Sequence, residues 1–170
     1  DEKSGVSARL TISAFENLKI AAERRALINH QTTTHILVSD FNGVIQAITG
    51  KVELVYEGEQ EGAVNVAHRL ISAAIRSLAS EYFPDFEQVR DKQHPEIRQK
   101  YVSVMSWFEK GNELDLLNDA SQKDYEEQIG AIKGLSKAMG KEIPSDQKIL
   151  FMEYLLHVLA EFSLLDKKML

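Results

Sequence analysis

The sequence feature that most constrains the fold is an apolar stripe close to the end of the chain. Its residues recur three or four positions apart, which is the spacing of one face of an α-helix: Phe151, Leu155, Val158, Leu159, Phe162 and Leu165. Further apolar residues widen this face: Ile149, Leu150, Met152 and Leu156. Because so wide an apolar face must be covered, we expect this helix either at the centre of a helical core or against a partner that the chain does not contain.

Five earlier segments also have helical spacing, so we predict an all-α fold. Their ranges are 7–29, 39–50, 63–83, 95–110 and 121–140. The apolar face of the first is formed by Leu10, Ala14, Phe15, Leu18, Ala22 and Ala26. Its charged residues Arg9, Arg24 and Arg25 are expected on a solvated face, and residues 29–34 are expected to end it.

The ends of the other predicted helices carry typical residues. Ser39 and Asp40 suit the start of the second helix, although Gly43 weakens it. Pro95 suits the first position of the fourth helix. Ser121, with Asp124 three residues later, suits the start of the fifth, which Gly140 is expected to end.

The stretch after the second predicted helix leaves one choice open. Residues 51–56 mix β-branched and alternating residues, so they fit either a short extended segment or one more helical turn. Residues 56–62 contain two glycines and three acids, which is the composition of a loop, and this loop divides the chain.

Composition excludes several classes of function. The 170 residues include no cysteine, which removes disulfides, thiolate catalysis and cysteine-based zinc sites. The net charge is -6 and the basic residues are scattered among acids, so we expect no nucleic-acid partner. No apolar run approaches the length that spans a bilayer, so we expect no membrane partner and a cytoplasmic location.

No motif for nucleotide or metal chemistry is complete. Gly50 and Lys51 suggest a phosphate-binding loop, but Ile45 stands where that motif needs a glycine and Val52 where it needs a hydroxyl. The histidines lack the spacing of zinc ligands: His30, His35, His68, His94 and His157. The acids near the loop are interpreted as solvated rather than as a cation site, and whether 57–61 binds anything stays open: Glu53, Glu57, Glu59 and Glu61. Five aromatic residues are expected in the core: Tyr82, Phe83, Phe86, Trp107 and Phe108.

Three stretches resemble one protein family. They are Ser4-Gly-Val-Ser-Ala-Arg9, Glu23-Arg-Arg-Ala-Leu27 and Ile48-Thr-Gly-Lys-Val-Glu-Leu-Val-Tyr-Glu-Gly-Glu59. This pattern is similar to the second-sensor and lid region of magnesium-chelatase-like and MoxR-type AAA+ ATPases, a group that includes proteins described as sigma-54-interacting regulators. The resemblance covers roughly residues 4–82 and is weakest beyond Pro84.

The resemblance implies a function for the whole chain. Residues 1–50 would form the helical lid, and residues 51–170 a C-terminal helical module. Arg9 matches the second-sensor arginine, which reaches the γ-phosphate of ATP. The Walker motifs, the first sensor and the arginine finger are not in the sequence, so we expect no enzyme activity from this chain alone. ATP and Mg²⁺ would be held by an upstream core.

The partners implied are this core, neighbouring subunits and an unidentified protein client. The alternative is a stand-alone helical interaction module, in which the final helix offers its apolar surface to a partner or to a second copy.

Overall fold

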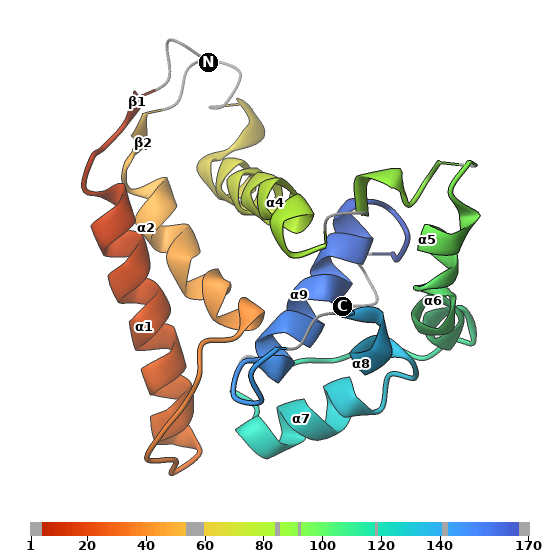
Figure 1. Cartoon of the computed structure of the whole chain (residues 1–170). Helices are drawn as coiled ribbons and strands as arrows, with labels where there is room; N and C mark the ends of the chain where they lie inside the picture. The colour runs from red at the N-terminus through yellow and green to blue at the C-terminus, as the bar shows by residue number, and fades with distance from the viewer. Residues whose placement is uncertain are drawn as a thin grey trace. The chain divides into compact units, whose positions relative to one another are not determined.

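A computed structural model describes residues 5–53, 60–83, 86–91, 93–117, 119–140 and 143–166. The chain is mostly helical, which confirms the predicted all-α class (Figure 1). It divides into two compact units, Asp1–Ala73 and Ala74–Leu170. This division differs from the boundary expected at residue 50. In the described residues no helix has both the length and the apolar character needed to cross a membrane.

In the first unit, one short strand precedes the first helix and another follows the second helix. Strand β1 (Gly5–Val6) precedes helix α1 (Leu10–Ile28), and strand β2 (Val52–Glu53) follows helix α2 (Ile45–Thr49). The strands are antiparallel, with Gly5 opposite Glu53 and Val6 opposite Val52. The extended alternative is therefore confirmed for residues 52–53, while 54–59 lie outside the described residues.

The core of the first unit lies between α1, α2 and the start of α4 (Ala63–Tyr82). Val44, Ile48 and Ala67 are its buried centre. Partly buried apolar side chains pack around them: Leu10, Ala14, Leu18, Phe41, Ile45, Val52 and Ile71. The boundary at 50 differs because Ala67 and Ile71 complete this core. Phe15, expected on the apolar face, is 63% exposed, since spacing gives a side chain's direction but not what covers it.

The second predicted helix starts in a tighter form than expected. Residues Val38–Val44 form a 3₁₀ helix, η1, which continues into α2. Gly43 explains how η1 approaches α1. A Cβ atom at this position would lie 3.0 Å from Ala21 Cβ and 3.3 Å from the Asn17 carbonyl oxygen. The glycine that weakened the helix prediction therefore permits close packing of the backbones.

Two helices end with the same capping geometry. After α1, His30 has a φ of 54°, and the Gln31 amide donates to the Ala26 carbonyl at 2.8 Å. After helix α9 (Lys148–Glu161), Ser163 has a φ of 55°, and the Leu164 amide donates to the Leu159 carbonyl at 2.8 Å. Both are Schellman motifs, in which one left-handed residue ends the helix. The predicted break at residues 29–34 is confirmed.

The second unit contains the end of α4 and the remaining helices. They are the 3₁₀ helix η2 (Phe86–Gln88), α5 (Pro95–Gln99), α6 (Val102–Glu109), α7 (Gln122–Gly130), α8 (Leu135–Ala138) and α9. Helix α7 packs on α9, and α6 packs on α8. The residues of α9 that are buried are Met152, Glu153, Leu155, Leu156, Val158, Leu159 and Ala160. Helix α9 therefore lies at the centre of the core, which was the first of the two positions that the sequence left open for it.

Two predicted helices are each divided in two. The segment 95–110 breaks at Tyr101, whose amide donates to the Arg98 carbonyl at 3.0 Å instead of continuing the α-helical pattern. The segment 121–140 breaks at Gly134, which has a φ of 87° that an α-helix cannot contain. Its start is confirmed, because the Ser121 hydroxyl accepts from the Asp124 amide at 3.2 Å and donates to its carboxylate at 2.7 Å.

We predict that Gly134→Ala destabilises the protein by about 2–4 kcal/mol, because the left-handed backbone and a steric overlap act together. The added Cβ would lie 2.5 Å from Ser103 Cβ. Gly111→Ala is the matched control, since Gly111 has a φ of 83° but no atom within 4 Å of the added Cβ. The control should lose only about 1–2 kcal/mol. Urea unfolding measures both, and equal losses would contradict the contact with Ser103.

Candidate functional site

The predicted site residue Arg9 lies at the amino end of α1. It is the N-cap residue of this 19-residue helix, and its side chain is exposed. In the described part of the chain its guanidinium forms no ion pair. An exposed guanidinium at a helix amino end offers planar donors where the helix dipole already favours an anion. This position can bind a phosphate or carboxylate that comes from outside the described residues.

Strand pairing brings together two of the stretches that carry the family resemblance. Besides the β1–β2 pairing, the Ser7 amide donates to the Lys51 carbonyl at 3.1 Å, and the Arg9 amide donates to the Ser7 hydroxyl at 3.3 Å. The backbone just before Arg9 is therefore fixed against residues 51–53. These contacts position the start of α1, while the Arg9 side chain itself extends into solvent.

Arg25 is buried, so the prediction that it belongs to a solvated face is wrong. Its Nη2 lies 3.1 Å from Asp40 Oδ2 and its Nε lies 3.3 Å from Asp40 Oδ1. The side chains are 1% and 3% exposed. The sequence contained a signal for this, because Arg25 follows Leu18 by seven residues and lies on the same helical face. Arg24 is exposed, as predicted.

The buried pair also satisfies backbone groups in the segment after α1. Arg25 Nη2 donates to the His35 carbonyl at 2.7 Å. The sequence predicted that Asp40 caps the start of the second helix. Asp40 instead lies inside η1, where its Oδ2 accepts from the Leu37 amide at 2.8 Å. These bonds hold residues 35–40 against the last turns of α1. Each charge has several partners, which offsets the cost of removing it from water.

An aromatic cluster forms the interior of the second unit. Phe86 lies 4.9 Å from Phe162 and 5.2 Å from Tyr101, and Tyr82 lies 5.1 Å from Phe151, all as ring-centroid distances. The predicted core positions of Phe83, Phe86 and Phe108 are confirmed, since each is at most 3% exposed. Tyr82 and Trp107 are partly exposed. Phe83, Phe86 and Phe108 therefore serve as core residues of this unit.

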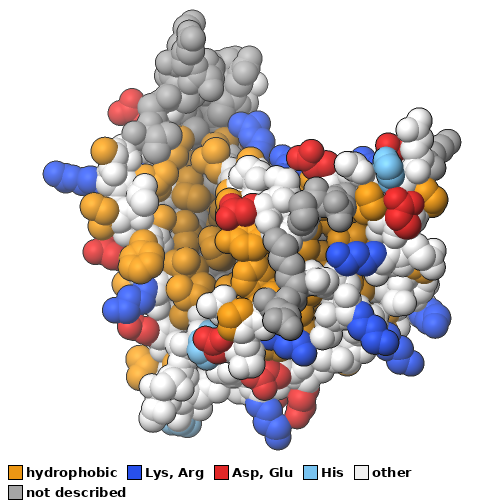
Figure 2. Space-filling model, in the orientation of Figure 1, with side chains coloured by type: hydrophobic (Ala, Val, Ile, Leu, Met, Phe, Trp, Pro, Cys, Tyr) orange, Lys and Arg blue, Asp and Glu red, His pale blue; other side chains and the backbone are white. Residues whose placement is uncertain are grey.

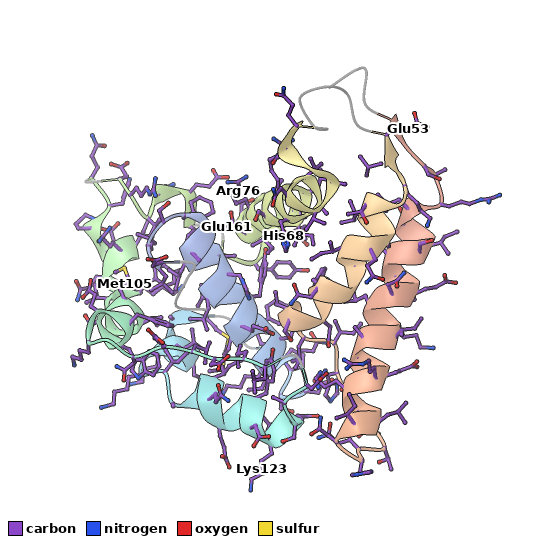
Figure 3. All side chains as sticks on the ribbon, turned by 180° about the vertical axis from the view of Figure 1, so that it is seen from behind. Glu53, His68, Arg76, Met105, Lys123 and Glu161 are labelled. Carbon is purple, nitrogen blue, oxygen red and sulfur yellow. The ribbon has the colours of Figure 1, made fainter. Side chains whose placement is uncertain are left out.

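Polar groups link α9 to the end of α4. The Tyr154 hydroxyl donates to the Ile75 carbonyl at 2.8 Å. Burial, followed by the nearby Tyr82 and Glu81, raises the pKa of Tyr154 to about 12. Arg76 of α4 and Glu161 of α9 lie side by side, 3.7 Å apart (Figure 3).

One buried carboxylate was not anticipated from the sequence. Glu153 is 1% exposed and accepts a hydrogen bond from the Tyr125 hydroxyl at 3.3 Å. Its signal in the sequence was its place inside the apolar run of α9, between Met152 and Leu155. The sequence could not identify its partner, because Tyr125 is on another helix.

The structure locates most residues of the incomplete nucleotide and metal motifs. Gly50 ends α2 and is followed by a strand, whereas a phosphate-binding loop joins a strand to a helix. Glu61 pairs with Arg69 at 3.0 Å, while Glu57 and Glu59 lie outside the described residues. Within the ranges that the structure describes, no three histidine or carboxylate side chains are grouped to hold a metal ion.

We predict that Asp40→Asn destabilises the protein by about 3–5 kcal/mol, because Arg25 would remain buried without a countercharge. Glu23→Gln in α1 is the control, since Glu23 forms an exposed ion pair with Lys19. Loss of an exposed pair should change stability by about 1 kcal/mol or less. Both are measured by urea unfolding. A loss from Asp40→Asn no larger than that of the control would contradict a buried pair.

We also predict that Tyr154 is a late-titrating phenol. Its folded pKa of about 12 exceeds the unfolded value of 10.0. Between these values the native state binds more protons than the unfolded state, so the free energy of unfolding falls as the pH rises through this window. Tyr154→Phe should make that fall shallower and remove one phenolate signal near pH 12 from an ultraviolet titration. Tyr82→Phe, the control, should keep that signal. An ultraviolet titration curve near pH 12 that is unchanged by Tyr154→Phe would contradict the assignment.

Comparison of the chain with protein-family models, with curated proteins and with solved structures found no match.

Proposed function

We propose that this chain forms the helical lid and C-terminal appendage of an AAA+ ATPase of the magnesium-chelatase-like or MoxR type. The observation that carries the proposal is the position of Arg9, with an exposed side chain at the amino end of α1. It occupies the place of the second-sensor arginine in the stretch that resembles this family. A guanidinium there is suited to contact the γ-phosphate of ATP held by a separate core.

The supports at both ends of α1 fit a lid that moves as one body. At the amino end, the Ser7–Lys51 hydrogen bond and the β1–β2 pairing fix the backbone before Arg9. At the carboxyl end, the Arg25–Asp40 pair fixes the segment that turns back along α1. A phosphate bound at Arg9 would therefore act on the whole helix and not on one flexible side chain.

Under this proposal, this chain and an upstream core have different roles in ATP hydrolysis. The core would bind ATP and Mg²⁺ with its Walker motifs, and Arg9 would add one contact to the terminal phosphate. The helices of the second unit would then couple nucleotide turnover to a neighbouring subunit or a protein client. The chain alone would have no ATPase activity.

One observation favours a second candidate, a helical interaction module that acts alone. The apolar side chains of α9 that this hypothesis relied on are buried. Helix α1, however, exposes apolar side chains among its charged ones (Figure 2): Ile12, Phe15, Ile20 and Leu27. A surface of this kind is typical of protein contacts. Under this second function, replacing Arg9 would leave activity and binding unchanged.

The test replaces Arg9 in a polypeptide that joins this chain to its ATPase core. Arg9→Ala should lower ATP turnover about tenfold or more, because a charge-assisted contact to phosphate contributes about 1.5–3 kcal/mol. Arg24→Ala is the matched control, since it removes an exposed guanidinium from another part of α1. The control should keep turnover within about twofold, and circular dichroism checks that both variants fold. Normal turnover by Arg9→Ala would overturn the role given to Arg9.

A further inference from the structure

The second unit contains a groove that the proposed function does not use. Its volume is about 710 Å³, within the range of ligand sites, and residues of α6, α7, α8 and α9 line it. Its apolar lining is formed by Ile132, Ile149 and Met152. Its polar lining is formed by Ser103, Glu126, Lys133, Ser136, Lys137, Ser145 and Lys148.

The groove exists because the chain turns between α7 and α8. Gly134, with its left-handed backbone, packs against Ser103 of α6, and both residues line the groove. The turn places Lys133 just before this glycine and Lys137 within α8. A continuous helix over 121–140, as the sequence suggested, would not form this turn.

The groove concentrates positive charge in an acidic chain. Lys133, Lys137 and Lys148 are exposed, and none of them forms an ion pair with a carboxylate in the part of the chain that the structure describes. Other lysines do form such pairs, for example Lys123 with Glu127 at 3.7 Å. Among the lining residues that the structure describes, Glu126 is the one carboxylate, and it accepts from Gln122 at 3.0 Å. The described lining therefore carries three cations against one anion, while the whole chain has a net charge of -6.

The lining residues select the kind of anion. None of the described lining residues is aromatic, so they offer no platform on which a nucleobase would stack. None of them is an arginine, so the planar fork that matches a phosphate is absent from the described lining as well. Lysines beside isoleucine and methionine side chains instead suit carboxylates that flank an apolar side chain, and methionine adapts its shape to such a guest. The serine hydroxyls can bond to the backbone of a peptide.

We propose that this groove binds an acidic segment of a partner protein, with an apolar side chain against Ile132, Ile149 and Met152 and flanking carboxylates on Lys133, Lys137 and Lys148. Arg9 is not among the residues that line this groove, and the inference holds whether or not the chain serves an ATPase.

The test uses a fluorescent peptide of the repeating sequence Glu-Glu-Leu-Glu-Glu-Leu, titrated with the full chain at low salt and followed by anisotropy. The triple variant Lys133→Gln, Lys137→Gln, Lys148→Gln should weaken binding about tenfold, since three exposed charge pairs together contribute about 1–2 kcal/mol. The control is Lys19→Gln, Lys110→Gln, Lys123→Gln, which removes the same charge from residues outside the groove; Lys123 points away from the body of its unit in Figure 3. The control should bind within about twofold of the parent chain.

Two altered peptides separate the contributions of charge and apolar contact. Replacing Glu by Gln should abolish most of the binding, and replacing Leu by Ala should weaken it. In a methyl spectrum the parent peptide should shift Ile132 and Ile149 in particular. Equal binding by the groove variant and the control variant, or shifts confined to other methyl groups, would overturn the proposal. Inorganic phosphate or a single-stranded oligonucleotide that occupies the groove as tightly as the peptide would also overturn it.

Discussion

The buried ion pair between Arg25 and Asp40 determines the course of the first unit. It joins the last turns of α1 to the segment that leads into η1, and it also satisfies the His35 carbonyl and the Leu37 amide. These bonds hold residues 35–40 against α1. The pair thereby directs η1 and α2 back along α1, where Gly43 allows close approach to Ala21 and Asn17. That return brings β2 beside β1 and fixes the backbone that precedes Arg9.

The second unit follows a different principle, which is the burial of one apolar helix. Most of helix α9 is buried, so its stripe is a core element, and Lys148, Ile149 and Met152 near its amino end border the lysine-lined groove. Tyr82 packs on Phe151 of this helix, Phe86 packs on Phe162 at its end, and the Tyr154 hydroxyl connects it to the backbone of α4. The surface features of this unit, including the lysine-lined groove, depend on turns between the shorter helices that surround α9.

Periodicity predicted the elements that depend on neighbouring residues in the chain. The ranges of α1 and α4, the helical nature of α9, the capping of α7 by Ser121 and the break after Asn29 all follow from local patterns and agree with the structure. Periodicity did not predict the division of 121–140. A glycine at 134 is compatible with a helix when only its neighbours in the chain are considered, and Ser103, which occupies the space beside it, belongs to another helix. The buried state of Arg25 was missed for a similar reason, since its countercharge lies fifteen residues away.

The candidate site could be named from the sequence only by resemblance. Spacing and composition place Arg9 before an amphipathic helix, and the structure agrees that it is exposed there. No physical rule converts that position into a phosphate sensor without the nucleotide-binding residues, which are not in this sequence. The lysine groove could not be anticipated at all, because its lining comes from four helices and depends on the left-handed turn at Gly134.

The central claim is that Arg9 recognises the terminal phosphate of ATP bound by another part of the same enzyme. The most direct measurement compares the affinities for ADP and for a non-hydrolysable ATP analogue, with and without Arg9→Ala, in the polypeptide that includes the core. The account predicts that the substitution weakens the analogue about tenfold and leaves ADP nearly unchanged, because ADP lacks the phosphate that Arg9 contacts. Equal effects on both nucleotides, or no effect on either, would contradict it.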